Sequence, residues 1–301
     1  MDMQQSAGLS LLTVTEAADY LRMGERKLYE LVAEGGMPCT KVTGKWLFPR
    51  AELDRWLLSG LARPAGMVPA DPPPIVGGSH DPLLQWALAE SRAGLAMLPE
   101  GSEAGYQRFL KGEVIAAAIH FHSLDDVTAD ANVAIVSREP ALYDSVLIAF
   151  AARAQGFVVA KGNPHKITSL HDARARKARL IARPKGAGAQ QLLEALMKQE
   201  SLTARDLPAA IVAPTGPDIA HAIRAGIGDF GIATEAIALA ADMDFVPIVT
   251  ERFDLIMRQR DSYRPALQKL LALLRSSAFS EHARELGGLD VREAGQVRYA
   301  P

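Results

Sequence analysis

The sequence contains a single cysteine, Cys39, among its 301 residues. One cysteine excludes an internal disulfide and a thiolate metal cluster within one chain. An excess of charge of one sign is also missing, because the formal net charge is −2 at pH 7. This balance is unlike that of a general nucleic-acid coat protein, so any DNA binding has to come from a local basic patch.

Long hydrophobic runs are missing as well. No uninterrupted apolar stretch of about 18 residues occurs, which argues against a transmembrane helix. The N-terminal residues MDMQQSAGLS lack the basic region followed by an apolar run that a secretory signal has. We therefore predict a cytoplasmic protein that has no membrane partner.

Length and composition indicate two domains with a sizeable core, because 301 residues exceed the usual size of a single domain and 49% of them are hydrophobic. The segment SGLARPAGMVPADPPP, residues 59–74, has five prolines and two glycines in sixteen residues. Such a composition cannot sustain a helix and favours a semi-rigid, extended chain. We predict domains at residues 9–59 and 75–301, with a Pro-rich linker at residues 60–74.

The first domain begins with two short helical patterns. Thr13 and Thr15 are candidate N-caps, and Glu16 stands three positions after Thr13 in capping-box spacing. A first helix in LTVTEAADYL is expected to end at residues 22–24, and a second is expected over residues 25–34, before two glycines. Two short helices that lie three residues apart have the spacing of a helix-turn-helix.

After the second helix, the sequence predicts a small β-hairpin, or wing. Its strands are expected at residues 39–42 and 46–48, and Gly44 in the turn between them tolerates a positive φ. A third helix is then predicted in AELDRWL, with an inward face made of Leu53, Trp56 and Leu57.

The stretch LLTVTEAADYLRMGERKLYELVAEGGMPCTKVTGKWLFPRAELDRWL resembles the excisionase-type, MerR-like winged helix-turn-helix family through its pattern of AA, L, Y, G-x-P, G-x-W and L-x-x-W. The resemblance implies that the second helix enters the major groove of double-stranded DNA and that the wing tip meets the backbone or the adjacent minor groove. The residues expected to contact bases or phosphates are Arg22, Glu25, Arg26, Lys27, Tyr29, Lys41, Thr43, Lys45 and Arg50. A merely solvated position stays open for each, and Tyr29 is expected to be partly in the core.

From residue 75 onward, short apolar runs alternate with helical patterns, as in IVGGS then PLLQWALAE, and ARLIARP then AQQLLEALMKQE. Such alternation predicts an α/β domain with largely parallel strands covered by helices. Two turns of small residues, 77–82 and 185–189, each join a strand to a helix. They direct backbone N–H groups and the positive end of a helix dipole at one point, and so predict a site for a small anion.

The region from about residue 74 to residue 297 resembles the periplasmic-binding-protein-like sensor domain of the type II fold, which is related to molybdate-binding proteins. The likeness rests on VGGSHDPLL, GSEAGYQRFLKGEVIAAAIHFHS, QGFVVAKGNPHKI, RPKGAGAQ, AIRAGIGDFGIAT and DFVPIVTERFDLIM. It implies two α/β lobes around a hinge: lobe 1 from about residues 75–154 and 235–301, and lobe 2 from about residues 155–234. The whole chain is thus expected to be multidomain, a small α(+β) winged helix-turn-helix followed by a two-lobed α/β fold.

Carried over by position, this resemblance implies a ligand site in the cleft between the lobes. Its expected residues are Ser79, His80, Gly101, Ser102, His120, Lys185, Gly186, Ala187, Gly188, Ala189 and Gln190. Relatives commonly have a Gly-Ser-Gly-Thr-like sequence where this chain has GAGA, so two hydroxyl donors are absent, while Lys185 is expected to add positive charge. The expected effector is a small anion, either an oxyanion such as molybdate or tungstate, or a small organic acid.

Patterns for catalysis or metal binding are weak. His120 and His122 share one face of a predicted strand, but a metal site would need further ligands, for which the candidates are His80, Asp125 and Asp126. The adjacent residues Ser-His-Asp at 79–81 cannot form the relay of a hydrolytic triad, and the turn at 185–189 lacks the GK[ST] ending of a P-loop. We predict no enzyme, no metal and no cofactor.

These patterns together predict a ligand-responsive DNA-binding transcription regulator that acts as a homodimer on symmetric half-sites. Anion binding would close the two lobes and change how the paired DNA-binding domains are presented. Two other classes stay open: an enzyme that acts on an anionic substrate, and an excisionase-like DNA-architectural factor whose second domain senses nothing.

Overall fold

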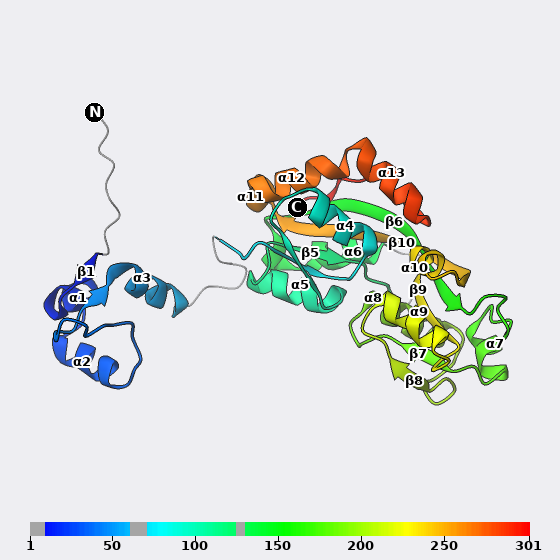
Figure 1. Cartoon of the computed structure of the whole chain (residues 1–301), viewed down its shortest axis with the longest axis horizontal. Coiled ribbons are helices and arrows are strands. Elements are labelled where there is room, and N and C mark those ends of the chain that lie inside the picture. Colours follow the sequence, from blue (N-terminus) through cyan, green and yellow to red (C-terminus); the bar gives the residue numbers. More distant parts are fainter. Residues whose placement is uncertain (1–9, 61–70, 125–129) are drawn as a thin grey trace. The chain divides into compact units, whose positions relative to one another are not determined.

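The structure is a computed structural model that describes residues 10–60, 71–124 and 130–301. The chain divides into two compact units, residues 1–64 and 65–301. Most of the predicted linker, residues 61–70, lies outside the described residues. Figure 1 shows the helices and strands of both units.

The described part of the N-terminal unit packs helices around a small apolar core. Its elements are β1 (Leu11–Leu12), α1 (Val14–Tyr20), α2 (Glu25–Ala33), β2 (Phe48–Pro49) and α3 (Arg50–Ser59). The predicted capping box is present, because the Thr13 hydroxyl accepts from the Glu16 amide and the Glu16 carboxylate accepts from the Thr13 amide. The fully or almost fully buried core residues are Ala17, Ala18, Leu28, Met37, Phe48 and Leu53.

The wing is smaller than predicted. In place of a two-stranded hairpin, a single bridge joins Thr40 and Leu47 by two backbone hydrogen bonds of 2.8 and 2.9 Å. Gly44 takes the positive φ expected of it, at 81°. Packing does not support a longer hairpin, because Val42 is 88% exposed and the residues after Leu47 pair with β1.

Two side chains that were predicted to be buried or partly buried are exposed. Leu57 of α3 and Tyr29 of α2 are each 46% exposed. Helix α3 packs instead through Leu53 and through Trp56, whose Nε1 donates to the Gly36 carbonyl at 2.8 Å.

The C-terminal unit is an α/β fold built on one large curled sheet. The order of its strands is β4-β3-β5-β10-β6-β9-β7-β8, and both β11 and β12 pair with β6. The strands are β3 (Ile75–Gly78), β4 (Ala96–Pro99), β5 (Ala116–Ile119), β6 (Ser145–Val159), β7 (Leu180–Ala182), β8 (Ala209–Val212), β9 (Phe230–Thr234), β10 (Asp244–Arg258), β11 (Leu289–Asp290) and β12 (Val297–Tyr299). The helices are α4 (Pro82–Glu90), α5 (Ser102–Lys111), α6 (Ala131–Arg138), η1 (Pro140–Leu142), α7 (Leu170–Ala175), α8 (Gly188–Gln199), α9 (Gly216–Arg224), α10 (Glu235–Ala240), α11 (Gln259–Ser262), α12 (Pro265–Leu274) and α13 (Ser277–Leu286).

The predicted parallel strands form two outer groups of the sheet. Strands β4, β3 and β5 are parallel neighbours, as are β9, β7 and β8. Between these groups run β6 and β10, two antiparallel strands of 15 residues each. Figure 1 shows this long pair passing from one lobe of the unit to the other, so the hinge consists of strands instead of a loop.

The chain returns from the second lobe to the first later than predicted. Ile237 and Ala238 of α10 belong to the same apolar cluster as Val158 and Ile219, which lie in the second lobe. The return therefore falls within β10, after the predicted boundary at residue 235. No helix of the described residues is long and apolar enough to cross a membrane.

Candidate functional site

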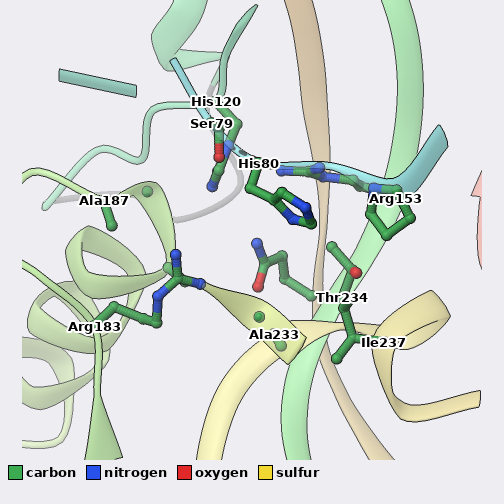
Figure 2. A pocket seen from close by; sticks show the side chains of 14 residues that line it. Ser79, His80, His120, Arg153, Arg183, Ala187, Ala233, Thr234 and Ile237 are labelled. Carbon is green, nitrogen blue, oxygen red and sulfur yellow. Dashed lines mark hydrogen bonds between the residues drawn. The ribbon is translucent and has the colours of Figure 1, made fainter. Parts of the chain in front are cut away.

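A small cavity lies in the C-terminal unit where residues of both lobes meet (Figure 2). It measures about 20 Å³, which is room for about one or two water-sized groups. The residues that line it are Ser79, His80, Pro82, His120, Arg153, Gln155, Arg183, Ala187, Gly188, Ala189, Gly216, Ala233, Thr234 and Ile237. Space of this size suits a small ion, whereas drug-sized organic ligands occupy pockets of roughly 300 Å³ or more.

Helix α8 directs its N-terminus at the cavity. Gly188 is the first residue of this 12-residue helix, and its N-cap, Ala187, makes no side-chain cap. The first backbone N–H groups of a helix have no partner inside it and carry partial positive charge. Helices α4, α9 and α10 also begin at lining residues, which are Pro82, Gly216 and the N-cap Thr234, but the Asp81 carboxylate already caps α4 by accepting from the Leu84 amide. The uncapped start of α8 favours an anion.

Arg183 brings a positive charge to the same space. It directly follows strand β7, and its Nη2 donates to the Pro214 carbonyl at 2.9 Å, while its buried Nε has no hydrogen-bond partner among the described residues. Burial lowers the pKa of Arg183 to about 10, against the opposing effect of the Asp218 carboxylate and with a smaller contribution from the charge of Arg153. The side chain therefore remains charged near pH 7, at a desolvation cost that an anion in the cavity would relieve.

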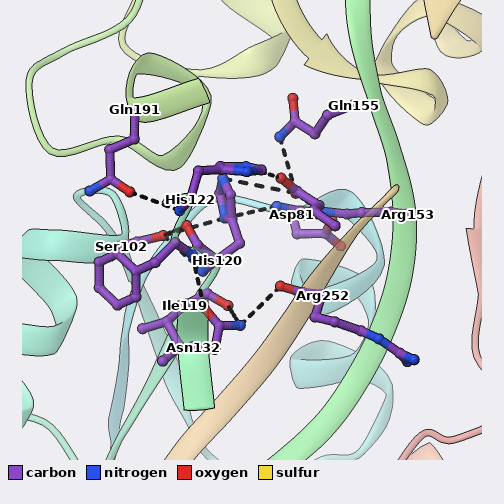
Figure 3. A network of polar contacts seen from close by, with 12 residues as sticks. Asp81, Ser102, Ile119, His120, His122, Asn132, Arg153, Gln155, Gln191 and Arg252 are labelled. Atoms are coloured by element: carbon purple, nitrogen blue, oxygen red, sulfur yellow. Dashed lines mark hydrogen bonds and ion pairs between the residues drawn. The ribbon is translucent and has the colours of Figure 1, made fainter. Parts of the chain in front are cut away.

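A second arginine, Arg153, is buried and fully engaged (Figure 3). Its Nη1 donates to Asp81 at 2.5 Å, its Nε donates to Glu251 at 2.5 Å, and its Nη2 lies 2.9 Å from Nδ1 of His120. Two carboxylates thus compensate this guanidinium. Its contribution to the cavity is to hold its neighbours, most directly His120.

His120 presents an N–H donor because of this contact. A guanidinium can only donate, so Nδ1 accepts from Arg153 and the proton of the neutral ring is on Nε2. Burial lowers the pKa of His120 to about 3, against the opposing effect of Glu251 and with the support of Arg153. Nε2 is buried without a hydrogen-bond partner among the described residues, and it lies 3.9 Å from the Glu251 carboxylate. It packs so closely on Gly188 that a Cβ there would lie 2.2 Å from it.

Gln155 and Thr234 form one wall of the cavity. They face each other as partners on the antiparallel strands β6 and β9. The Gln155 Nε2 donates to Glu251 at 3.0 Å, but its Oε1 and the Thr234 hydroxyl are buried without a partner among the described residues. An unpaired buried polar atom costs about 1–3 kcal/mol. With His120 and Arg183, four lining residues each present such an atom, and a polar ligand could pair with them.

The N-terminal unit offers a basic surface on and around α2. All nine residues predicted to contact DNA are exposed, including Glu25, whose carboxylate accepts from the Thr15 hydroxyl at 2.6 Å. Arg26 and Lys27 lie beside Glu30, at 3.5 and 3.3 Å, and the Arg26 side chain is 95% exposed. These weak surface pairs leave both cations available to phosphates. Near the wing, Lys41 lies over the ring of Trp46, and Arg50 lies over Tyr20.

Comparison with known proteins identifies the C-terminal fold. Residues 85–275 match the family model of the PBP superfamily domain. This chain belongs to the PBP superfamily. Residues 11–60 match the model of a helix-turn-helix domain, which supports DNA binding by the N-terminal unit.

Relatives of this PBP-superfamily protein include two uncharacterized proteins. YvgK of Bacillus subtilis strain 168 is 22% identical over 309 residues, which cover 96% of this chain and 97% of the relative. A protein of the ferredoxin 2Fe-2S gene 5′ region of Clostridium pasteurianum is 29% identical over 80 residues, 26% of this chain and 71% of the relative. A structure described as a phosphate ABC transporter substrate-binding protein of Clostridium perfringens, with bound phosphate, aligns with a TM-score of 0.52 at 10% identity, covering 71% of this chain and 97% of that one. The structural likeness shows the fold.

The PBP domain brings together about half of the predicted ligand residues. Those that line the cavity are Ser79, His80, His120, Ala187, Gly188 and Ala189. Those that do not line it are Gly101, Ser102, Lys185, Gly186 and Gln190. Lys185 is exposed and does not line the cavity, and the cation that lines it next to this turn is Arg183, two residues earlier.

Two of the residues outside the cavity support the lining. The Ser102 hydroxyl accepts from the His120 amide at 3.0 Å and donates to the His120 carbonyl at 3.1 Å, which fixes the backbone of that histidine. The Gln190 Oε1 accepts from the Arg183 amide at 3.1 Å. Gly186 contributes a contact between the lobes, because its carbonyl accepts from the Glu103 amide at 3.2 Å.

Sequence reasoning missed several lining residues, above all Arg153, Gln155 and Arg183. Arg153 and Gln155 stand in the apolar stretch SVLIAFAARAQGFVV of β6. A charged or amide side chain inside an apolar strand is a signal in itself, because its burial requires partners. Arg183 stands between the apolar strand LIA and the turn of small residues, where its charge faces the predicted anion site.

His122 does not belong to the cavity. Its Nε2 lies 2.8 Å from Glu251, and its backbone amide donates to Gln191 of α8 at 3.2 Å. Among the described residues, no group of three or more His, Cys, Asp or Glu side chains could hold a metal ion. The two aspartates that a metal site would have recruited, Asp125 and Asp126, lie outside the described residues.

Proposed function

We propose that this protein is a DNA-binding transcriptional regulator whose PBP domain senses a small oxyanion, the class that includes molybdate and tungstate. The observation that carries this proposal is the cavity of about 20 Å³ with a charged Arg183, the uncapped start of α8 and unpartnered donors on its walls. The helix-turn-helix match supports the DNA-binding half of the proposal.

The proposed role is binding without catalysis. A general base works best with a pKa near the operating pH. The pKa of His120, the buried histidine of the cavity, is about 3, because burial disfavours the charged ring. This histidine is therefore suited to donate a hydrogen bond and is unsuited to accept a proton from a substrate.

The proposed mechanism is a shift between open and closed arrangements of the two lobes. An anion held by His120 of one lobe and by Arg183 of the other favours the closed arrangement. Coupling between an effector site and a DNA site is typically about 1–3 kcal/mol. We propose that the protein binds DNA as a homodimer, because helix-turn-helix domains commonly read two symmetric half-sites.

The first test is calorimetric titration of the full chain with molybdate, tungstate, sulfate, phosphate and small carboxylates. We expect one or more oxyanions to bind to the wild type and to Lys185→Gln, and to bind much more weakly to Arg183→Gln. Lys185→Gln is the matched control, because it removes the same charge two residues away, at an exposed side chain. If only carboxylates bind, the proposed effector is a small organic acid instead of an oxyanion.

The second test asks whether anion binding changes the affinity of the protein for DNA. Duplexes that bind the full chain are selected from a random pool, and their affinity is then measured with and without the anion found by calorimetry. We expect the affinity to change by about fivefold or more, since coupling energies usually fall in this range. An affinity that is the same in both conditions would indicate a DNA-architectural factor instead of a sensor.

A further inference from the structure

The orientation of the Gln155 amide follows from its partner. Burial would raise the pKa of Glu251, but the neighbouring His120, Arg153 and His122 outweigh burial and hold that pKa well below its usual value. The ionised carboxylate can only accept, so the Gln155 atom 3.0 Å from it has to be the donor Nε2. The other end of the amide, Oε1, is therefore an acceptor, and it is buried in a side chain that is 2% exposed.

Most other groups offered to the ligand are donors. They are the Nε2–H of His120, the Nε–H of Arg183 and the first amides of α8. The Thr234 hydroxyl, which sits across from Gln155 on β9, can donate or accept. So can the Ser79 hydroxyl and the neutral His80 ring, which also line the cavity. The cavity thus combines several donors with one acceptor of fixed orientation.

A fully deprotonated oxyanion matches only part of this set. Sulfate, molybdate and tungstate carry no proton near pH 7, so each of their oxygens accepts. Against such an ion, the Gln155 Oε1 would face another acceptor and stay unpaired in a buried site, which is unfavourable. An oxyanion that keeps one O–H group would donate that proton to Oε1 and give its remaining oxygens to the donors.

We propose that the cavity selects oxyanions that retain an O–H group at neutral pH, of which hydrogen phosphate is the simplest. In this proposal, the Gln155 Oε1 recognises the O–H group by accepting its hydrogen bond. This inference rests on the proposed anion site and narrows it to one chemical class. Buried sites built to bond a particular ligand hydrogen reject analogues that lack it, because the site's own polar group is left unpaired.

The experiment compares ions of similar shape that differ in this proton. The full chain is titrated calorimetrically near pH 7 with inorganic phosphate, sulfate and molybdate, in the wild type, Gln155→Leu and Gln107→Leu. The last is the control, because Gln107 is an exposed glutamine of α5 whose amide bonds Glu103 on the surface. We expect phosphate to bind to the wild type at least about tenfold more tightly than sulfate or molybdate.

The Gln155→Leu variant distinguishes a role of Gln155 in recognising the ligand O–H group from a role in stabilising the fold. We expect phosphate binding to weaken about ten- to a hundredfold while sulfate binding stays the same or improves, since a hydrogen bond to a charged group is worth about this much. A purely structural role would instead weaken all three ions together and would overturn the proposal. If the variant does not fold, the comparison of phosphate with sulfate in the wild type decides alone.

Failure of this proposal differs from failure of the proposed function. Sulfate or molybdate that binds to the wild type as tightly as phosphate, with Arg183→Gln abolishing the binding, would leave the anion sensor intact and overturn the role of Gln155. If no anion binds, or if Arg183→Gln binds as well as Lys185→Gln, the anion site itself is wrong and this inference falls with it.

Discussion

Replacing Arg183 by glutamine should change the stability of the protein in opposite directions without and with its anion. Without the anion, the variant loses a partly buried charge, whose desolvation is reflected in a pKa lowered to about 10. We therefore expect the free energy of unfolding of Arg183→Gln to equal or exceed that of the wild type when no anion is present.

With the anion, the balance reverses. A hydrogen bond to a charged group contributes about 1.5–3 kcal/mol, and two charges 4 Å apart attract by about 4 kcal/mol at an effective dielectric constant of 20. We take a loss of about 3 kcal/mol, which corresponds to roughly hundredfold weaker binding. At an anion concentration of 100 times the wild-type Kd, the wild type gains about 2.7 kcal/mol of stability, whereas the variant gains only about 0.4 kcal/mol.

The assay is chemical denaturation of the wild type, Arg183→Gln and Lys185→Gln, each with and without the anion. Lys185→Gln should follow the wild type in both conditions, since its side chain is exposed. Equal anion stabilisation of the two variants would refute the assignment of Arg183 to the ligand. A variant that is less stable than the wild type without anion would show that Arg183 is structural, and would refute the argument from its burial.

Three further outcomes are expected. Arg26→Ala and Lys45→Ala should each weaken binding to a selected duplex, and Lys45→Ala should weaken binding to all sequences alike and reduce the salt dependence of the affinity. Fluorescence anisotropy at several salt concentrations measures both effects. Unchanged affinity in both variants would contradict the proposed contacts of α2 and the wing with DNA. Gly188→Ala should lower the melting temperature and abolish anion binding, because its Cβ would lie 2.2 Å from Nε2 of His120 and 2.3 Å from the His120 carbonyl. A variant that binds normally would contradict the close packing of Gly188 on His120. Burial raises the pKa of Asp254 to about 6, above its ordinary value of 3.8, so its contribution to stability is present at low pH and is lost as the pH rises through 6. Denaturation at pH 5 and pH 7 should therefore show the wild type losing stability relative to Asp254→Asn, and a pH-independent difference would contradict this.

Local features of the sequence were sufficient for the first domain. The cap at Thr13, the glycines after α2 and the spacing of the two helices each depend on neighbours a few residues away. The wing was overestimated because alternating residues around Gly44 suggest a hairpin, whereas the observed pairing partner of Phe48 is Leu12, far away in the sequence. A short segment cannot indicate which distant strand it joins.

The candidate site, too, could be predicted only where it depends on neighbouring residues in the sequence. The turn before α8 was predicted from its small residues, and Ala187 and Gly188 do line the cavity. Arg153, in contrast, is placed there by the pairing of β6 with β10, which sets it opposite Glu251, 98 positions later. Whether Arg183 or Lys185 faces the cavity depends on where β7 ends, and no residue pattern specified that to within two positions.

The path of β10 has a consequence for how the protein is made on the ribosome. In the sheet, β10 lies between β5 and β6, and its residue Glu251 holds both Arg153 and Gln155. Domains generally fold as units from the N-terminus during synthesis. The DNA-binding unit, residues 1–64, can therefore fold while the cavity cannot yet exist, because the cavity needs more than four-fifths of the chain to have emerged. We expect a nascent chain to acquire its helix-turn-helix surface well before its anion cavity.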